Sequence, residues 1–287
     1  MKFNRKTAFK RNIGLMSESE LKKLKTFTIA IPGMGWVWSS HIISLVRQWF
    51  QKFKIADFDR YELHNFNRQI WATLNTVGSE KAKIMKEKAL EINPNCEIKI
   101  YEKWINKKNI DDFLDWVDLA IDSLDFFAIE IRRIFLNKCH KMKIPCIIAW
   151  PIWYGCAWLI FMPKWPNFDK YLNVNENTSY DNLLLSFWLW LTPSLLHITY
   201  MKNVSLKNKT APSSIAGVNV CSWFVIVNAL KILLNWWGVK AVPYYHQYDM
   251  MKNKYVCKRL IFWLNSPWQK MRLKIALKII SRKSKNN

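Results

Sequence analysis

A glycine-containing loop is the first feature of the sequence that could do chemistry. The run Gly33-Met34-Gly35-Trp36-Val37-Trp38 follows a β-branched apolar segment and precedes a helical pattern. In a nucleotide-binding loop of this type, small residues let the backbone approach phosphate groups at the N-terminus of a helix. Trp36 and Trp38 oppose that use, because an indole would fill the space that a phosphate needs. The loop alone leaves open whether a nucleotide binds here.

Further polar residues follow the loop in a fixed order. Asp57 ends a second strand pattern, where a carboxylate can bind ribose hydroxyls. Arg68 lies within the run Asn65 to Gln69, Lys81 comes thirteen positions later, and Asp125 lies just beyond a fourth strand pattern. An arginine and a lysine are typical ligands of a triphosphate, whereas hydride transfer does not need them. Each residue alone is typical of a surface charge or a helix cap, so the prediction depends on the whole set.

Alternating strand and helix patterns position these residues in the first half of the chain. Strands are predicted at 26–31, 53–57, 97–101, 117–121 and 145–149, and helices after residue 37, over 79–92 and over 126–141. A capping box, Ser17 to Glu20, begins a short basic helix before the first strand. The alternation predicts an α/β Rossmann-like fold with a mainly parallel sheet and helices on both faces.

The second half follows a different pattern. A strand at 155–162 and a hairpin of 241–248 with 255–262 are predicted to continue the sheet with antiparallel strands. Between them lie a segment at 163–212 rich in Pro, Asn and Lys, with an apolar stretch at 183–191, and an apolar helix at 215–234. The predicted divisions are an N-terminal helical arm (1–26), a nucleotide-binding domain (27–162), a crossover with buried helix and antiparallel strands completing the same fold (163–265), and a basic helical tail (266–287).

The apolar helix is long enough to suggest a membrane span. Residues 215–237 reach the required length, but they include Asn219, Asn228 and Lys231, each of which is costly in lipid. We predict a buried core helix and no stable membrane span. Residues 1–11 are basic and lack the apolar core of a signal peptide, so we expect a cytoplasmic location.

Charge and cysteine content restrict the function classes. The 287 residues carry 44 Lys+Arg against 21 Asp+Glu, a formal net charge of +23. This balance favours polyanions such as nucleotides, RNA or an anionic membrane, and it is equally typical of a lysine-rich, AT-biased genome. The six cysteines form no C-x-x-C pair, which argues against a zinc ribbon. Cys221 lies inside the apolar helix, where we expect a buried, unreactive thiol.

The motifs together resemble those of the ThiF/MoeB/HesA family, the bacterial relatives of ubiquitin-activating enzymes. The family pattern is G-x-G-G-x-G, a D-x-D ending the second strand, N-x-x-R-Q, G-x-x-K, and a D-x-x-D ending the fourth strand. The matching stretches here are residues 33–38, Asp57 to Asp59, Asn65 to Gln69, Gly78 to Lys81 and Asp122 to Asp125. The resemblance covers about residues 11–260 and departs from the pattern at Trp36 and Trp38.

The resemblance implies an ATP-dependent adenylyltransferase that activates a carboxylate and releases pyrophosphate. The implied cofactor-binding residues are Gly33, Gly35, Trp36, Trp38, Asp57, Asn65, Arg68 and Lys81. Arg68, Lys81, Asp125 and Arg11 would be catalytic, with Asp125 binding Mg and Arg11 reaching into the neighbouring subunit of a homodimer. Such a site suits the reaction, because a carboxylate that attacks the α-phosphate meets negative charge that cations and a metal must neutralise.

Several acceptors and two other functions stay open. The acceptor implied by the family is the C-terminus of a ubiquitin-like or sulfur-carrier protein, or a peptide. An RNA-linked carboxylate, as in tRNA-modifying dehydratases, is the alternative suggested by the net charge and basic tail. An NAD(P)-dependent oxidoreductase would also be compatible with Gly33, Gly35 and Asp57 alone. An inactive nucleotide-binding module is the interpretation favoured by Trp36 and Trp38. With no Cys between Cys156 and Cys221, we expect adenylation without a thioester on this protein.

Tryptophan and glycine are present in unusual numbers. The chain has 17 Trp and 7 Gly, whereas glycine is ordinarily far the more abundant. One hypothesis is that the gene uses UGA for glycine and has been translated with UGA as tryptophan, since Trp36 and Trp38 fall on the two missing glycines of the loop. Trp49, Trp71, Trp104, Trp116, Trp153, Trp165, Trp236 and Trp237 also lie at predicted turns or element ends. Trp158 and Trp268 are expected to be genuine.

Overall fold

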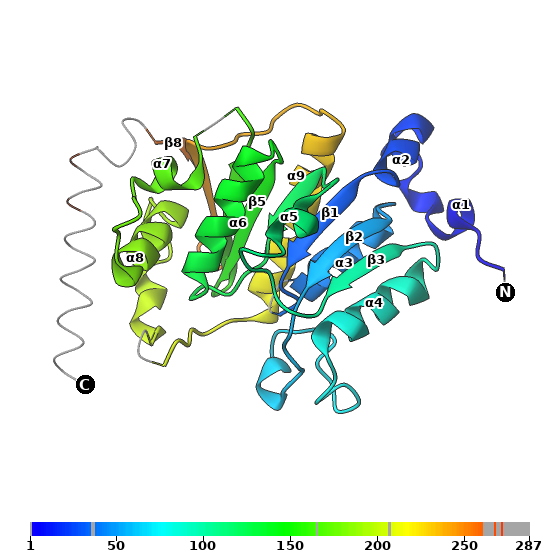
Figure 1. The fold of residues 1–287 in the computed structure, drawn as a ribbon, viewed down its shortest axis with the longest axis horizontal. Coiled ribbons are helices and arrows are strands. Elements are labelled where there is room, and N and C mark those ends of the chain that lie inside the picture. The colour runs from blue at the N-terminus through cyan, green and yellow to red at the C-terminus, as the bar shows by residue number, and fades with distance from the viewer. Residues whose placement is uncertain are drawn as a thin grey trace.

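An eight-stranded sheet forms the centre of the molecule in the computed structural model (Figure 1). The structure describes residues 2–35, 38–164, 166–205 and 208–260, together with Pro267 and Met271. The strand order is β3-β2-β1-β4-β5-β6-β7-β8. The first five strands in this order pair in parallel, and β5 to β8 pair antiparallel. The predicted α/β Rossmann-like sheet, mainly parallel and continued by antiparallel strands, is therefore confirmed.

All eight strands lie close to their predicted positions. They are β1 Thr28–Pro32, β2 Lys52–Ala56, β3 Glu97–Tyr101, β4 Leu119–Asp122, β5 Cys146–Ile152, β6 Gly155–Phe161, β7 Tyr244–Asp249 and β8 Lys254–Arg259. Every residue of β4 and β6 is buried, because helices cover both faces of the sheet. Burial on two faces explains why these strands are continuous apolar runs in the sequence, without alternation.

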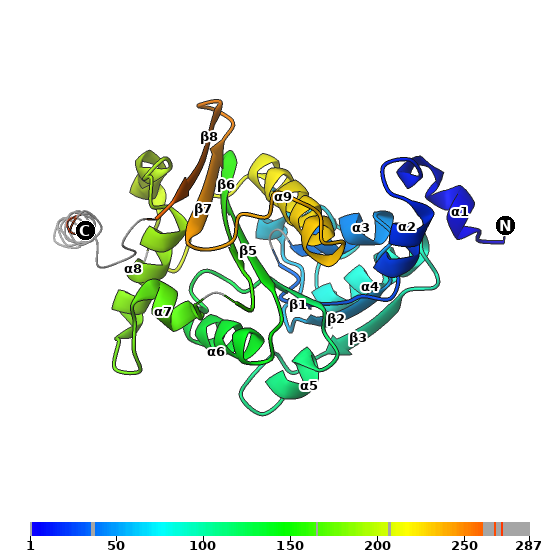
Figure 2. The ribbon, with the colours of Figure 1, turned by 90° about the horizontal axis from the view of Figure 1, so that it is seen from above.

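Helices cover the sheet in two layers (Figure 2). One layer holds α2 (Glu18–Leu24), α3 (Trp38–Arg47), α4 (Lys81–Ile92) and α9 (Ile215–Leu233). The other holds α5 (Ile110–Leu114), α6 (Ile129–Lys141), α7 (Phe168–Leu172) and α8 (Tyr180–Leu191). The N-terminal arm also contains α1 (Arg5–Ala8) and the 3₁₀ turn η1 (Lys10–Asn12), and two further 3₁₀ turns are η2 (Leu63–Asn65) and η3 (Ile198–Asn203).

The helices differ from the predicted ones in a few places. The helix predicted from residue 79 begins at Lys81, with Glu80 as its N-cap, and the one predicted from residue 126 begins at Ile129. The segment at 163–212 contains α7 and α8, which the sequence pattern did not assign; the apolar stretch at 183–191 forms most of α8. The predicted tail helix at 268–280 lies outside the described residues.

The apolar helix α9 packs within the fold. It lies against β5, β6 and α3, and Val218, Cys221, Val225 and Ala229 on one face are fully buried. Within the described residues, α9 is the one helix long and apolar enough to cross a membrane, and 56% of its apolar window is buried in the protein. The prediction of a buried core helix is met on this face only, because Trp223 and Val227 of α9 are 63% and 48% exposed. The prediction of a buried Cys221 thiol is confirmed, and burial raises the pKa of this group.

Candidate active site

A cavity of about 700 Å³ opens where the carboxyl ends of β1, β2 and β4 meet. In open α/β sheets this edge is where ligands bind. The cavity brings together seven of the residues predicted for the site, namely Gly33, Gly35, Asp57, Asn65, Arg68, Lys81 and Asp125. These residues span more than 90 positions of the sequence, so it is the parallel sheet that places them around one volume.

The glycine loop is held tightly against the end of β4. Gly33 has a φ of +102°, and a Cβ there would lie 2.2 Å from the carbonyl oxygen of Ser123. No residue with a side chain fits this position. The Gly33 N–H donates to the carbonyl of Ala56 at 2.6 Å, which ties the loop to the end of β2. The backbone at Gly33 is therefore held between the ends of β2 and β4.

Asp57 holds the glycine loop through hydrogen bonds to the backbone. Its carboxylate accepts hydrogen bonds from the Met34 N–H and from the Asp59 N–H, the second at 2.6 Å. Burial, reinforced by the nearby Asp59 carboxylate, raises the pKa of Asp57 to about 6. A carboxylate with a raised pKa in a cleft is typical of functional sites. Each oxygen uses one acceptor position on the backbone, so further positions stay available to a ligand.

Lys81 begins α4 and reaches the cavity from its first turn. Its Nζ donates to Asp59 Oδ2 at 2.9 Å, and its N–H donates to the Asp59 carbonyl at 3.0 Å. The Lys81 side chain is only 6% exposed, whereas that of Asp59 is 50% exposed. A buried lysine held by one partly exposed carboxylate can change partner when a stronger anion arrives.

Arg68 enters from the loop that follows η2. Its guanidinium donates to the His64 carbonyl at 2.6 Å and to Asn67 Oδ1 at 2.8 Å. Burial lowers the pKa of Arg68, and the nearby Asp125 carboxylate opposes that shift. Asn65, which is 2% exposed, orients this loop because its side-chain oxygen accepts the Glu62 N–H at 3.1 Å.

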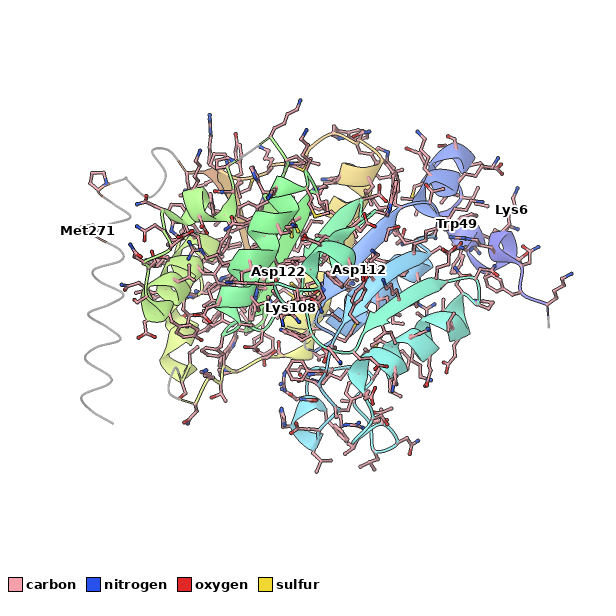
Figure 3. All side chains as sticks on the ribbon, viewed as in Figure 1. Lys6, Trp49, Lys108, Asp112, Asp122 and Met271 are labelled. Atoms are coloured by element: carbon pink, nitrogen blue, oxygen red, sulfur yellow. The ribbon has the colours of Figure 1, made fainter. Side chains whose placement is uncertain are left out.

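The end of β4 is anchored by a buried ion pair. Arg132 from α6 donates to Asp122 at 2.7 Å, and both side chains are fully buried. The same guanidinium donates to the carbonyls of Leu124 at 2.6 Å and Asp125 at 3.0 Å. Asp125 itself is exposed and accepts the Phe127 N–H at 2.9 Å. Arg132 thus fixes the backbone that carries Asp125 at the cavity rim; Figure 3 labels Asp122 near the centre of the ribbon.

Sequence reasoning missed several residues of the cavity. Gln69 and Ser123 line it, and the side-chain oxygen of each is buried without a hydrogen-bond partner among the described residues. Such atoms are suited to a polar ligand. The crossover residues Lys209 to Ser213 form another wall, and Asn67 Nδ2 donates to the Ser213 carbonyl at 3.0 Å. Gln69 was visible within the N-x-x-R-Q motif, whereas the crossover segment has no motif that could have revealed it.

Three predicted residues are not placed in the cavity. Arg11 lies in η1 of the N-terminal arm, is exposed, and does not line the cavity. Trp36 lies outside the described residues, and Trp38 begins α3 with a side chain that is also outside them. Two other tryptophans, Trp104 and Trp150, line the cavity.

Comparison with known proteins identifies the family. Residues 9–261 match the ThiF family, which covers most of the chain, and the chain belongs to this family. It is 32% identical over 140 residues to the tRNA threonylcarbamoyladenosine dehydratase of Bacillus subtilis, a match that covers 48% of this chain and 54% of that protein. It is 34% identical over 123 residues to a probable molybdopterin-synthase adenylyltransferase of Porphyra purpurea, covering 42% and 32%. The chain therefore spans about half or less of the length of these relatives.

Solved structures share the fold at lower sequence identity. E. coli MccB in its structure with ATP has a TM-score of 0.61 and 17% identity, and the match covers 84% of this chain and 65% of MccB. The structure of MccB with MccA-N7isoASN has a TM-score of 0.68 and 15% identity, covering 93% and 75%. These similarities show that the chain shares the fold of MccB over most of its length.

Proposed function

We propose that this chain is an ATP-dependent adenylyltransferase that activates a carboxylate as an acyl-adenylate. The observation that carries the proposal is the cavity in which Arg68 and Lys81 face the Gly33 loop and Asp57. Two cations beside a glycine loop suit a triphosphate. Relatives named as adenylyltransferases and the MccB structure with ATP support this choice of nucleotide over NAD(P).

Each residue then has a chemical task. Asp57 accepts hydrogen bonds from the ribose hydroxyls with the acceptor capacity that its two backbone bonds leave. Lys81 exchanges Asp59 for the phosphates, because a phosphate carries more charge than one carboxylate. The acceptor carboxylate oxygen bonds to the α-phosphorus, the bond from that phosphorus to the bridging oxygen breaks, and pyrophosphate leaves with the electron pair. Arg68 and Lys81 stabilise the charge that builds up on the phosphates.

Mg²⁺ fits this site as an ion shared with ATP. Proteins usually bind Mg²⁺ through one or two carboxylates plus substrate phosphates. Among the described residues, no group of three His, Cys, Asp or Glu side chains could hold a metal alone, and Asp125 is an exposed carboxylate at the cavity rim. Asp125 would therefore hold the ion only when phosphate oxygens complete its shell, and the bound ion would neutralise the leaving pyrophosphate.

We propose as acceptor the C-terminal carboxylate of a ubiquitin-like or sulfur-carrier protein or of a peptide. The crossover residues Lys209 to Ser213 are the wall of the cavity that such a chain would meet. The second candidate is a carboxylate attached to tRNA, favoured by the net charge of +23 and by the similarity to a tRNA threonylcarbamoyladenosine dehydratase. Salt-sensitive tRNA binding would support this second acceptor.

Exchange of labelled pyrophosphate into ATP tests the reaction. We expect exchange that depends on one class of acceptor, measured with carrier-protein tails, short peptides and tRNA, for both the chain as it stands and a W36G/W38G variant. Lys81→Ala should lower the rate by about 100-fold or more, the size expected for a lost cation at a developing charge. The matched control is Lys83→Ala, because Lys83 lies on the same helix, is half exposed and pairs with Glu80 outside the cavity. Flat exchange with every acceptor in both forms would contradict the proposal.

We also propose a homodimer in which Arg11 acts in the partner's cavity. Arg11 is exposed and remote from the cavity of its own chain, so a role in the reaction requires a second copy. Arg11→Ala and Lys81→Ala proteins should each be inactive, whereas mixing them should restore up to about a quarter of the activity, because half of the dimers are mixed and each has one intact site. Absence of recovery in subunit-exchanged mixtures would refute the shared site.

A further inference from the structure

Four tryptophans adopt a left-handed backbone conformation. Their φ values are 75° at Trp49, 31° at Trp104, 53° at Trp116 and 58° at Trp153. Bulky residues are rare in this region, because Cβ approaches the following carbonyl oxygen. Of the ten non-glycine residues with positive φ that the structure describes, four are Trp and three are Asn, although Asn is the non-glycine residue that tolerates this conformation best. The backbone at these four positions is one that glycine adopts without strain.

The position of Trp49 has a well-defined role at the end of α3. The Phe50 N–H donates to the Leu45 carbonyl at 3.2 Å, and the Trp49 N–H donates to the Val46 carbonyl at 3.2 Å. This pair of bonds is the Schellman motif, in which the left-handed residue is usually glycine. Two other helices end in the same way with asparagine, at Asn173 and Asn235. Lys143 ends α6 with the same pair of bonds, so Trp49 is the bulkiest of the four described residues in this position. Figure 3 shows Trp49 at the same end of the molecule as Lys6.

Trp153 occupies a tight hairpin turn. Ile152 pairs with Gly155 at the end of the β5–β6 ladder, so Trp153 and Tyr154 form a two-residue loop. Only the first of these two residues has a positive φ, the sign pattern of a type II′ turn. Glycine is the residue favoured at the first central position of that turn.

Trp116 and Trp104 lie in loops and differ in what the indole contacts. Trp116, between α5 and β4, is 86% exposed, which is unusual for so large an apolar side chain. Trp104 follows β3, where Asn109 Nδ2 donates to its carbonyl at 2.8 Å. Its half-buried indole packs edge-on against Phe58, at 5.0 Å between ring centroids, and lines the cavity. Only the Trp116 loop gains no burial from the indole.

Indole hydrogen bonding does not separate these tryptophans from the others. Buried tryptophan N–H groups normally find a partner. In the part of the chain that the structure describes, the indole N–H groups of Trp49, Trp71, Trp158 and Trp190 are buried without one. By contrast, Trp236 donates to Glu20 Oε1 at 2.6 Å. The Trp49 indole does lie over Arg5, at 5.0 Å, but that contact does not relieve its backbone.

We propose that the cell in which this gene is expressed inserts glycine at positions 49, 104, 116 and 153, and equally at positions 36 and 38 of the loop, because UGA codons there are read as glycine. The turn geometry supports the proposal at the first four positions. At the two loop positions it is supported by the excess of Trp over Gly and by the G-x-G-G-x-G pattern. The change completes the phosphate loop on which the proposed function rests, and it removes the Trp104 indole from the cavity wall.

Codons and peptide masses test the identity of these residues without any assay of function. UGA at the six positions, together with peptides from the native cell whose masses contain glycine there, would establish the proposal. UGG codons, or peptides of tryptophan mass, would overturn it. Because neither readout involves ATP, failure of the proposed function would leave this result intact, and the reverse holds as well.

Melting temperatures of paired variants test the structural reason. At positions 49 and 153, the Trp→Gly protein should melt above the Trp→Ala protein, because alanine does not share the left-handed preference of glycine. Trp188 is the matched control: it is buried in the middle of α8, where Trp188→Ala should melt above Trp188→Gly. Equal or reversed order at 49 and 153 would show that these turns are not built for glycine.

ATP binding tests the loop itself. Calorimetry should show tighter Mg-ATP binding by the W36G/W38G variant than by W36A/W38A, since only glycine lets the backbone approach the phosphates closely. Equal binding by both variants, with UGG codons at 36 and 38, would overturn the loop part of the proposal.

Discussion

The two walls of the cavity differ in how their residues are specified. In the wall formed by β1, β2 and β4, Asp57 and Asp125 follow strands, and their carboxylates accept hydrogen bonds from nearby backbone N–H groups. The crossover wall, Lys209 to Ser213, is held by the side-chain bond from Asn67 to the Ser213 carbonyl and by an isolated β-bridge between Ser213 and Trp153. We call the first wall rigid because backbone bonds and the buried Asp122–Arg132 pair hold it, and we propose that ATP chemistry depends on this wall and acceptor choice on the crossover.

The largest effect should come from the anchor of the rigid wall. Asp122→Ala leaves Arg132 buried without its carboxylate, which typically costs about 3–5 kcal/mol of unfolding free energy. Urea unfolding would measure the loss. The control is Asp112→Ala, which breaks the exposed Lys99 pair and should cost no more than about 1 kcal/mol. Similar losses in the two variants would show that the end of β4 is not specially anchored.

A smaller and more selective effect is expected in the crossover wall. Lys209 lines the cavity, and its Nζ lies 5.8 Å from the centroid of the Tyr180 ring. Lys209→Ala should lower kcat/KM for the acceptor by roughly tenfold, or about 1.4 kcal/mol, while the Kd of Mg-ATP stays the same. Lys164→Ala, an exposed lysine outside the cavity, is the control. A weaker ATP affinity in the Lys209 variant would mean that ATP binding and acceptor binding are not divided between the two walls.

The smallest effect concerns pH and the rigid wall alone. Because the pKa of Asp57 is raised to about 6, this group disfavours folding once ionised, and its contribution to stability falls as pH rises from about 4 to 6. Binding has the opposite sign, since the ionised carboxylate is the better acceptor for ribose hydroxyls.

Adenosine separates this effect from the titration of ATP phosphates. Its affinity should fall several-fold between pH 7.5 and pH 5, and Asp57→Asn should bind weakly with no such dependence. A pH-dependent Asp57→Asn protein would assign the titration to another group.

Much of the rigid wall was predictable because its determinants are local. Apolar runs mark strands that are buried on both faces, and the parallel sheet then fixes where each strand ends. Asp57 could be placed at this edge from that pattern, whereas Arg68 and Lys81 were assigned to the same site through the resemblance to the family motifs. The crossover wall could not be predicted, because Lys209 reaches the cavity through a path that leaves no periodic pattern. The helices α7 and α8 were missed for the same reason.

The sequence by itself determined the order of strands and helices, the family, and the residues that follow each strand, since these depend on local pattern and chain order. Only the tertiary structure decided that Lys81 rests on Asp59, that Ser123 and Gln69 present buried oxygens to the cavity, and that Arg11 lies away from it. It also decided which tryptophans occupy left-handed turns. These facts depend on contacts between distant segments and on backbone angles, and neither leaves a mark in local residue patterns.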